Sequence, residues 1–213
     1  MKIVEQSFSF EYPITSEDWL REARLIENAG RTSHKSEDKI TDSSYTSFIK
    51  KLFMLKHDSV FEFGNMVVRF VTTRSVTHEL VRHRLCSFIQ ESQRYVDYSK
   101  DKFGKEITFV KPIQFVNENS EEYAIWFYGC KEAEERYFDM LKIGVSAQNA
   151  RSILPNSAKT EIVVKTNWRE WALIFKQRAI SRAAHPDMRA LMIPLYQECR
   201  KQCPEVFDMG EPE

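Results

Sequence analysis

Two runs of β-branched residues set the limits on how this chain folds. The segments NMVVRFVT (65–72) and KTEIVVKT (159–166) each predict a strand, because such side chains pack well on a pleated sheet. EITFVKPI (106–113) predicts a third, shorter strand. Helical patterns surround these runs, and the longest has an apolar stripe between Tyr123 and Leu141. The order lacks a regular βαβ alternation and predicts an α+β fold, with a mixed or antiparallel sheet flanked by helices.

The chain is long enough for one sizeable domain. Its 213 residues include no Pro-, Ser- or Gly-rich linker, so we expect a single domain over residues 1–213. Glycine occurs only 6 times, and the sequence contains neither a GxGxxG nor a P-loop pattern. A dinucleotide-binding Rossmann domain is therefore not indicated.

The charge balance and the cysteines limit which binding partners and which cellular compartment are expected. The 31 basic residues are balanced by 31 acidic ones, so neither nucleic acid nor an acidic membrane surface is an expected partner. No apolar stretch approaches the ~20 residues of a membrane span, and the first residues lack the apolar run of a signal peptide. The 4 cysteines form no CxxC pair and indicate reduced thiols in a cytoplasmic protein. No metal-ligand spacing is found among the histidines, so no metal site is expected.

The segment RHRLCSFIQESQRY (82–95) is crowded with fixed hydrogen-bond donors. Arginine has a rigid fork that matches phosphate, and Ser92 and Arg94 are close enough along the chain to converge on one phosphate group. Gln90 and Gln93 add amides that can read a base or sugar edge. Cations also stabilise the C-terminal end of a helix, which is the structural alternative for the RHR triplet alone. The Ser-x-Arg-Tyr sequence that follows favours anion binding.

Arg178 stands out by its position on a helical stripe. Trp171, Phe175 and Arg178 are spaced i, i+4, i+7, so the arginine continues an apolar face. A permanently charged guanidinium that faces inward needs an anionic partner or a lined cavity. The alternative is an arginine that extends to solvent and pairs with a neighbouring acid.

The crowded segment resembles a known enzyme signature. The RHR triplet at 82–84, followed after seven residues by Ser92, matches the RHR-x7-S motif of flavin-dependent thymidylate synthases. Four more segments resemble parts of that family, which extends the resemblance over most of the chain: AGRTS (29–33), HDSVFEF (57–63), ARSILP (150–155), and NWREW with the QRA that follows it (167–179).

The resemblance implies synthesis of dTMP from dUMP without an enzyme thiolate. It implies FAD reduced by NADPH, a methylene group from methylenetetrahydrofolate, and a homotetramer with sites shared between subunits. For dUMP it implies Arg82, Gln90, Glu91, Ser92, Gln93, Arg94, Arg151 and Arg178. For FAD it implies Ser33, Ser59, Glu62, Arg82, His83, Arg84, Gln90, Asn167 and Arg169. Arg178 is the implied catalytic residue, against uracil, where it would stabilise negative charge as N3 ionises.

Departures from the family pattern keep alternatives open. Relatives carry histidine at the position of Phe63, often glutamine at that of Glu79 and often asparagine at that of Ile89. These three differences fit a non-catalytic homologue that binds a flavin or a nucleotide. The stretch after Arg178, AISRAAHPDMR, is one residue longer than in some relatives, so Arg182 is the alternative activating arginine. A nucleic-acid-binding module that uses the 82–95 segment is the other alternative, against which the zero net charge argues.

Cys86 is a candidate nucleophile only because arginines flank it in the sequence. Flanking arginines lower the pKa of a thiol. A small buried cysteine is the commoner case, and the resemblance implies no covalent enzyme–nucleotide bond. Cys86 is therefore left outside the predicted chemistry.

Overall fold

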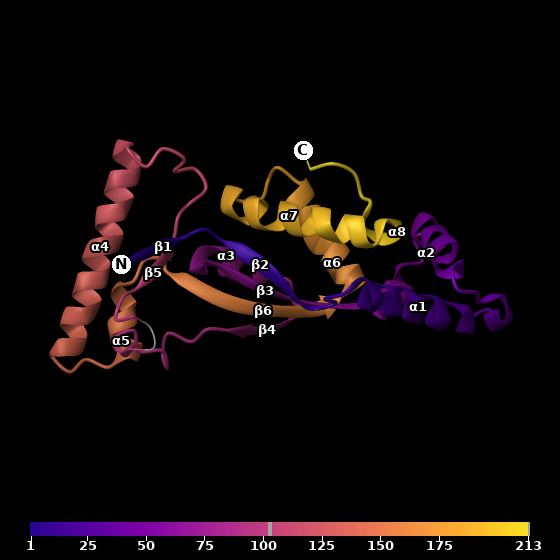
Figure 1. Cartoon of the computed structure of the whole chain (residues 1–213), viewed down its shortest axis with the longest axis horizontal. Helices are drawn as coiled ribbons and strands as arrows, with labels where there is room; N and C mark the ends of the chain where they lie inside the picture. Colours follow the sequence, from indigo (N-terminus) through magenta and orange to yellow (C-terminus); the bar gives the residue numbers. More distant parts are fainter. Residues whose placement is uncertain (102–103, 213) are drawn as a thin grey trace. The chain divides into compact units, whose positions relative to one another are not determined.

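Figure 1 shows the computed structural model of the chain, which describes residues 1–101 and 104–212. The strands are β1 (Lys2–Val4), β2 (Ser7–Tyr12), β3 (Asn65–Thr73), β4 (Ser87–Gln90), β5 (Thr108–Val110) and β6 (Lys159–Asn167). The helices are α1 (Ser16–Thr32), α2 (Ser44–Met54), α3 (Arg74–Leu80), α4 (Glu121–Lys142), α5 (Ala147–Ala150), α6 (Trp168–Phe175), α7 (Pro186–Gln202) and α8 (Pro204–Phe207). Shorter turns are the 3-10 helices η1 (Glu37–Lys39), η2 (Asp58–Glu62) and η4 (Arg151–Ile153), and the one-turn π-helix η5 (Lys176–Ile180).

The β-branched runs are confirmed as strands. They form β3 and β6, the two central strands of a four-stranded sheet in the order β2–β3–β6–β4. Along β3 every second side chain is buried, as a half-covered sheet requires. The third run contributes the shorter β5, which pairs in parallel with β1, while Phe109 forms an antiparallel bridge with Ala158. Helices flank these strands, which confirms the α+β class with a mixed sheet.

Residue contacts divide the chain into two compact units. Unit 1 comprises Met1–Ser7, Phe70–Arg82 and Ile89–Ile162. Unit 2 comprises Phe8–Arg69, His83–Phe88 and Val163–Glu213. Four of the five points where the chain passes between the units lie within the strands β2, β3, β4 and β6, and the fifth lies between Arg82 and His83. The single domain over residues 1–213 stays a prediction.

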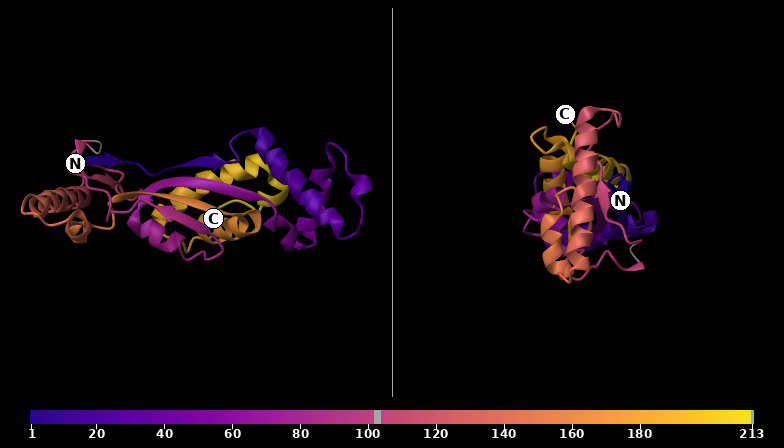
Figure 2. Two further views of the ribbon diagram at one scale, coloured as in Figure 1. Left: turned by 90° about the horizontal axis from the view of Figure 1, so that it is seen from below. Right: turned by 90° about the vertical axis from the view of Figure 1, so that its left-hand side faces the viewer.

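The core of unit 1 lies under its longest helix. Figure 2 shows α4 running beside the β1–β5 pair. Tyr137 of α4, Phe109 of β5 and Tyr98 are buried in one cluster, and the Tyr98 and Tyr137 rings meet edge to face at 5.9 Å. The predicted apolar stripe of the long helix is therefore confirmed in part: Cys130 and Tyr137 are core, and Trp126, Met140 and Leu141 pack against the same cluster partly buried.

The core of unit 2 is built from aromatic side chains around α6. Trp168 is fully buried, with its ring centroid 5.6 Å from that of Trp19 on α1 and 5.5 Å from that of Phe207 on α8. Its indole nitrogen donates to the Asn65 carbonyl oxygen at 3.2 Å. Trp171, also buried, donates to the next carbonyl of β3. These contacts fix α6, and the residues that follow it, against the sheet.

Within residues 1–101 and 104–212, no helix is both long and apolar enough to cross a lipid bilayer.

Candidate functional site

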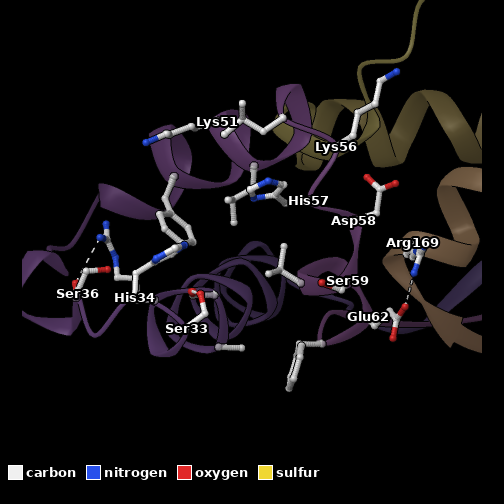
Figure 3. A pocket seen from close by; sticks show the side chains of 18 of the residues that line it. Ser33, His34, Ser36, Lys51, Lys56, His57, Asp58, Ser59, Glu62 and Arg169 are labelled. Atoms are coloured by element: carbon white, nitrogen blue, oxygen red, sulfur yellow. Dashed lines mark hydrogen bonds and ion pairs between the residues drawn. The ribbon is translucent and has the colours of Figure 1, made fainter.

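A large cavity in unit 2 gathers four of the predicted flavin contacts. It measures about 980 Å³ and is lined by the end of α1, by α2, by η2 and by Arg169 of α6. Ser33, Ser59, Glu62 and Arg169 all line it, although they come from three separate segments of the chain. In Figure 3, Ser33 and His34 lie toward one end of the cavity, and Glu62 and Arg169 lie at the other. The structure therefore brings these four predicted residues together.

The cavity wall is positively charged. Lys39, Lys51 and Lys56 line it, and none of these lysines forms an ion pair with a carboxylate of the described residues. At the far end, an Arg169 terminal nitrogen donates to Glu62 Oε1 at 2.5 Å (Figure 3). Because unpaired cations outnumber the carboxylates that line this space, the cavity favours an anionic ligand.

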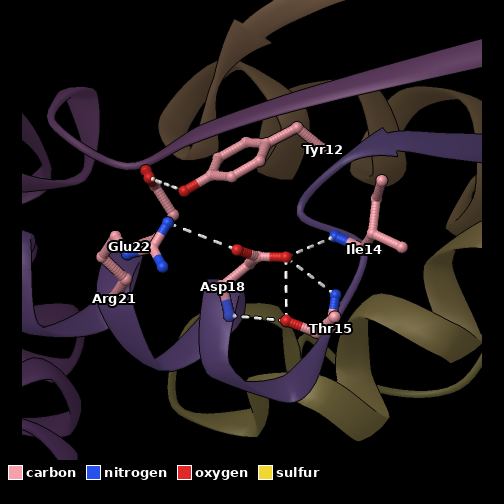
Figure 4. A network of polar contacts seen from close by, with 6 residues as sticks. All are labelled: Tyr12, Ile14, Thr15, Asp18, Arg21 and Glu22. Carbon is pink, nitrogen blue, oxygen red and sulfur yellow. Dashed lines mark hydrogen bonds and ion pairs between the residues drawn. The ribbon is translucent and has the colours of Figure 1, made fainter.

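The N-terminus of α1 is anchored by two carboxylates, shown in Figure 4. Asp18 accepts from the backbone nitrogen of Thr15 at 2.9 Å, and the Thr15 hydroxyl caps the helix by accepting from the Asp18 backbone nitrogen. The Tyr12 hydroxyl and the Asn65 backbone nitrogen each donate to a different oxygen of Glu22, both at 2.6 Å. These bonds join α1 to β2 and β3, so the far end of the helix, at the cavity, has a fixed position.

His83 and Arg178 are direct neighbours in unit 2. The Arg178 Nε–H donates to His83 Nε2 at 3.2 Å, and the Glu170 carboxylate lies 3.5 Å from His83 Nδ1. Burial, and then the Arg178 guanidinium, lower the pKa of His83. The imidazole is therefore neutral at pH 7 and can accept the arginine's hydrogen bond. One residue predicted for FAD thus orients the residue predicted to be catalytic.

The predicted stripe on α6 is confirmed in part. Trp171 and Phe175 are fully buried and their rings stack at 5.6 Å. Arg178 follows them on the π-helix η5 and is half-buried. A π-turn changes the direction of the side chains after Phe175, and such turns are frequent at functional sites.

A second cavity lies in unit 1. It measures about 540 Å³ and is lined by six residues: Arg74, Gln93, Gln148, Asn149, Arg151 and Ser152. Arg151 is the first residue of η4, directly after α5, and its Nε donates to the Gln148 carbonyl oxygen at 3.2 Å. Two residues predicted for dUMP, Gln93 and Arg151, therefore line one space.

Gln90 and Glu91 have polar partners within unit 1. Gln90 Nε2 donates to the hydroxyls of Thr77 at 3.0 Å and Thr160 at 3.1 Å. The Glu91 carboxylate accepts from the Tyr98 hydroxyl at 2.9 Å and from Lys159 at 3.1 Å. These bonds hold both side chains against their neighbours in unit 1. A role of Gln90 and Glu91 in dUMP binding stays a prediction.

Comparison with known proteins assigns the family. Residues 17–205 match the family model described as thymidylate synthase complementing protein. The chain belongs to this family. A flavin-dependent thymidylate synthase from Geobacter sulfurreducens is 31% identical over 171 residues, which are 80% of this chain and 71% of the relative. One from Pyrococcus furiosus is 31% identical over 191 residues, 89% of this chain and 75% of the relative.

A solved structure shows the same fold. The UMP/dUMP methylase PolB from Streptomyces cacaoi, bound with 5-Br dUMP, superposes with a TM-score of 0.76. The superposition covers 98% of this chain and 96% of that one at 19% sequence identity.

The remaining predicted residues of this family member lie outside both cavities. Arg82 and Arg84 are exposed and follow the C-cap of α3, so they do not occupy the last turn of that helix. Asn167 uses its side-chain oxygen to cap α6, accepting from the Glu170 backbone nitrogen at 2.9 Å. Arg94 is exposed, with its guanidinium 5.5 Å from the centre of the Tyr95 ring.

Ser92 is half-exposed in the turn after β4. Its hydroxyl accepts from the Arg94 backbone nitrogen at 3.3 Å, which fixes the two residues relative to each other.

Replacement of Cys86 by serine is expected to leave dTMP formation largely intact. Burial, and then the nearby Glu170 carboxylate, raise the pKa of Cys86 to about 11. The group is therefore a thiol at neutral pH and carries no nucleophilic charge. Turnover and dUMP affinity of the Cys86→Ser variant should stay close to the parent. A loss of several orders of magnitude in turnover, with FAD and dUMP still bound, would make Cys86 a nucleophile.

Sequence reasoning missed the basic wall of the first cavity and Arg74 in the second. Lys39, Lys51 and Lys56 lie on η1, on α2 and in the turn after α2, and no sequence motif joins them, so the sequence carries no signal that they share a site. For Arg74 the sequence carries a weak signal, because Arg74 follows a buried strand and is the first residue of a helix. Among the residues that the structure describes, no group of His, Cys, Asp and Glu side chains is arranged to hold a metal ion.

Proposed function

We propose that this protein is a flavin-dependent thymidylate synthase. It converts dUMP to dTMP by reductive methylation, with methylenetetrahydrofolate as the one-carbon donor and FAD reduced by NADPH. The observation that carries the proposal is the cavity of unit 2, which gathers Ser33, Ser59, Glu62 and Arg169 in a chain whose residues 17–205 match the family model. The relatives named for this activity support it.

The unit 2 cavity suits FAD in its chemistry. The hydroxyls of Ser33 and Ser59 and the carboxylate of Glu62 can bond ribose and ribityl hydroxyls, and the unpaired lysines suit a diphosphate. Its volume of about 980 Å³ is at the upper end of ordinary ligand sites. When bound, FAD supplies the reducing equivalents of the reaction. His83, Arg84 and Asn167 belong to the proposed flavin-binding set.

The protein's own groups bind and polarise the nucleotide. Arg94, Ser92 and Arg151 bind the dUMP phosphate through charge-assisted hydrogen bonds. Arg178 donates to the uracil and stabilises the negative charge that develops as N3 loses its proton. His83 keeps that guanidinium in place, because a neutral imidazole accepts its Nε–H. The pyrimidine is thereby activated without a thiolate.

We also propose a cytoplasmic homotetramer whose sites are shared between subunits. The family resemblance supports the assembly, and the division of the predicted residues between two compact units is compatible with shared sites. Balanced charge supports small-molecule partners rather than nucleic acid or a membrane surface.

The test of the function is a set of three measurements on the purified protein. We expect the absorbance spectrum of bound FAD, NADPH oxidation that depends on dUMP and methylenetetrahydrofolate, and dTMP as the product. Bound FAD without dUMP-dependent oxidation would instead identify a flavin-binding homologue that has lost turnover. Strong, salt-dependent DNA affinity without bound FAD would identify a nucleic-acid module.

Alanine at Arg94 or Ser92 is expected to weaken dUMP binding while FAD content stays unchanged. Each change removes a hydrogen bond to a charged phosphate, which costs on the order of 1.5–3 kcal/mol. Arg94→Lys should recover only part of the affinity, because an ammonium group cannot reproduce the bidentate fork. Titration with dUMP measures the effect, and a dissociation constant within twofold of the parent for either alanine variant would contradict the phosphate assignment.

A further inference from the structure

Glu170 is a buried carboxylate of unit 2 that the proposed mechanism does not use. It is the third residue of α6, and its side chain is 7% exposed. Within residues 1–101 and 104–212, the carboxylate has its ion-pair partner in His83, whose Nδ1 lies 3.5 Å from Oε1. The neighbouring cation, Arg169, is bonded to Glu62 instead. Because a carboxylate is costly to bury without a partner, its contact with His83 indicates a role there.

The sequence position of Glu170 also fits a helix cap, but the carboxylate is not used for one. Asn167 and Glu170 have the spacing of a capping box, in which the third helical residue bonds back to the backbone nitrogen of the N-cap residue. In α1 both halves of such a box are present, made by Thr15 and Asp18. In α6 the Asn167 side chain accepts from the Glu170 backbone nitrogen at 2.9 Å, whereas the Glu170 carboxylate lies beside His83.

The bond between Arg178 and His83 fixes the tautomer of the imidazole. A guanidinium nitrogen can only donate, so Nε2 of His83, which receives the Arg178 Nε–H at 3.2 Å, carries no proton. Burial, and then the Arg178 cation, lower the pKa of His83, so the ring is neutral at pH 7 and its one proton is on Nδ1. That nitrogen faces Glu170 at 3.5 Å, the outer limit of a hydrogen bond. A shift of the proton to Nε2 would abolish the bond to Arg178.

We propose that Glu170 is a positioning residue for Arg178 and acts through the imidazole of His83. The carboxylate holds the tautomer that is protonated on Nδ1, so that Nε2 stays an acceptor and keeps the guanidinium in place. The inference rests on the function proposed above and adds a residue that lies outside the RHR-x7-S motif and lines neither cavity. Because Glu170 contacts neither nucleotide nor flavin in this role, its loss should affect turnover rather than binding.

The first experiment compares two substitutions in the full-length protein with FAD bound. Glu170→Leu removes the acceptor, and Glu170→Gln keeps an amide oxygen that can accept from Nδ1–H. Glu17→Leu is the matched control, since Glu17 is an exposed first-turn carboxylate of α1 that lines neither cavity. For Glu170→Leu we expect turnover at saturating dUMP to fall about 10- to 100-fold, with the KM for dUMP and the FAD content within about threefold of the parent. Glu170→Gln should keep roughly a third or more of the parent's turnover.

Three kinetic outcomes would overturn the proposal. The first is a turnover of Glu170→Leu within about twofold of the parent. The second is an equal loss of turnover in Glu170→Gln and Glu170→Leu, because the amide preserves the acceptor. The third is a raised KM for dUMP without a loss of turnover, which is the pattern of a binding contact.

The tautomer of His83 can be measured directly and without turnover. Nitrogen NMR of the protein labelled in its 5 histidines distinguishes a protonated ring nitrogen from an unprotonated one, and His83→Gln assigns the signal. We expect the proton on Nδ1 in the parent and in Glu170→Gln, and a mixture that includes the Nε2-protonated form in Glu170→Leu. A parent with the proton on Nε2, or an unchanged tautomer in Glu170→Leu, would contradict the proposed role.

A thermal melt separates positioning from support of the fold. Burial raises the pKa of Glu170, which means that the ionised carboxylate costs free energy in the folded state. We therefore expect Glu170→Leu to melt no lower than Glu17→Leu, although its turnover is reduced. A lower melting temperature than that of the control, with the His83 tautomer unchanged, would make Glu170 structural. If Glu170→Leu does not fold, the turnover and the tautomer of Glu170→Gln and the parent decide.

The two readouts distinguish this inference from the proposed function. If the parent forms dTMP and Glu170→Leu turns over normally, the inference fails and the function stands. If the parent forms no dTMP, the function fails, and the tautomer of His83 in the parent and in Glu170→Leu still tests whether Glu170 holds the imidazole. An unchanged tautomer would then overturn that role as well.

Discussion

Replacing Arg178 with alanine is expected to lower dTMP formation at saturating dUMP by ~10²–10³-fold, while FAD remains bound. The reason is that a pre-positioned donor stabilises charge developing in the transition state far better than water, which must reorganise. Its position is held from two directions. Trp171 and Phe175 bury the preceding turn, and His83 accepts the Arg178 Nε–H at 3.2 Å. Saturating dUMP removes the contribution of ground-state binding, so the loss should appear in turnover.

Three variants test this expectation. Arg178→Lys should recover little activity, since an ammonium group lacks the planar fork that would let one side chain contact His83 and the proposed uracil site together. Lys176→Ala is the matched control, because Lys176 is an exposed cation on the same π-helix. Arg182→Ala tests the alternative arginine that lies just after η5. A collapse of turnover in Arg182→Ala, with near-normal turnover in Arg178→Ala, would transfer the activating role to Arg182.

Trp168→Ala is expected to destabilise the protein by about 3–5 kcal/mol, the largest loss foreseen for a single substitution. The side chain is fully buried between Trp19 and Phe207, and its removal leaves a cavity that these rigid rings cannot fill. The hydrogen bond from the indole to the Asn65 carbonyl oxygen is lost as well. Backbone packing is also tight here, since a Cβ placed on Gly64 would lie 2.8 Å from the Trp168 ring.

Urea unfolding followed by circular dichroism measures this effect. Trp126→Ala is the matched control, because Trp126 is a partly buried tryptophan of α4 whose indole nitrogen has no partner among the described residues. The control should lose clearly less stability than Trp168→Ala. Equal losses would mean that the aromatic cluster around α6 contributes no more than an ordinary helix surface.

The sequence by itself determined the elements and the family of this protein. Strands β3 and β6 and the long helix α4 follow from local side-chain patterns. The reason is that a strand or a helix with one buried face places its buried side chains at a regular spacing along the sequence, whatever it packs against. The RHR-x7-S motif is also local, so the family could be inferred from it. The stripe from Trp171 to Phe175 was correct for the same reason, since both residues lie on one face of α6.

Only the tertiary structure decided which side chains share a site. Ser33 and Glu62 line one cavity because α1, α2 and η2 pack together. No local sequence pattern encodes that these segments lie side by side. The bond between His83 and Arg178 joins segments far apart in the chain, as does the wall that unites Gln93 with Arg151. Arg74 was invisible to the motif for the same reason. Its Nη1 is one of the few buried side-chain atoms without a hydrogen-bond partner among the described residues, and which buried donors are paired is a property of the fold.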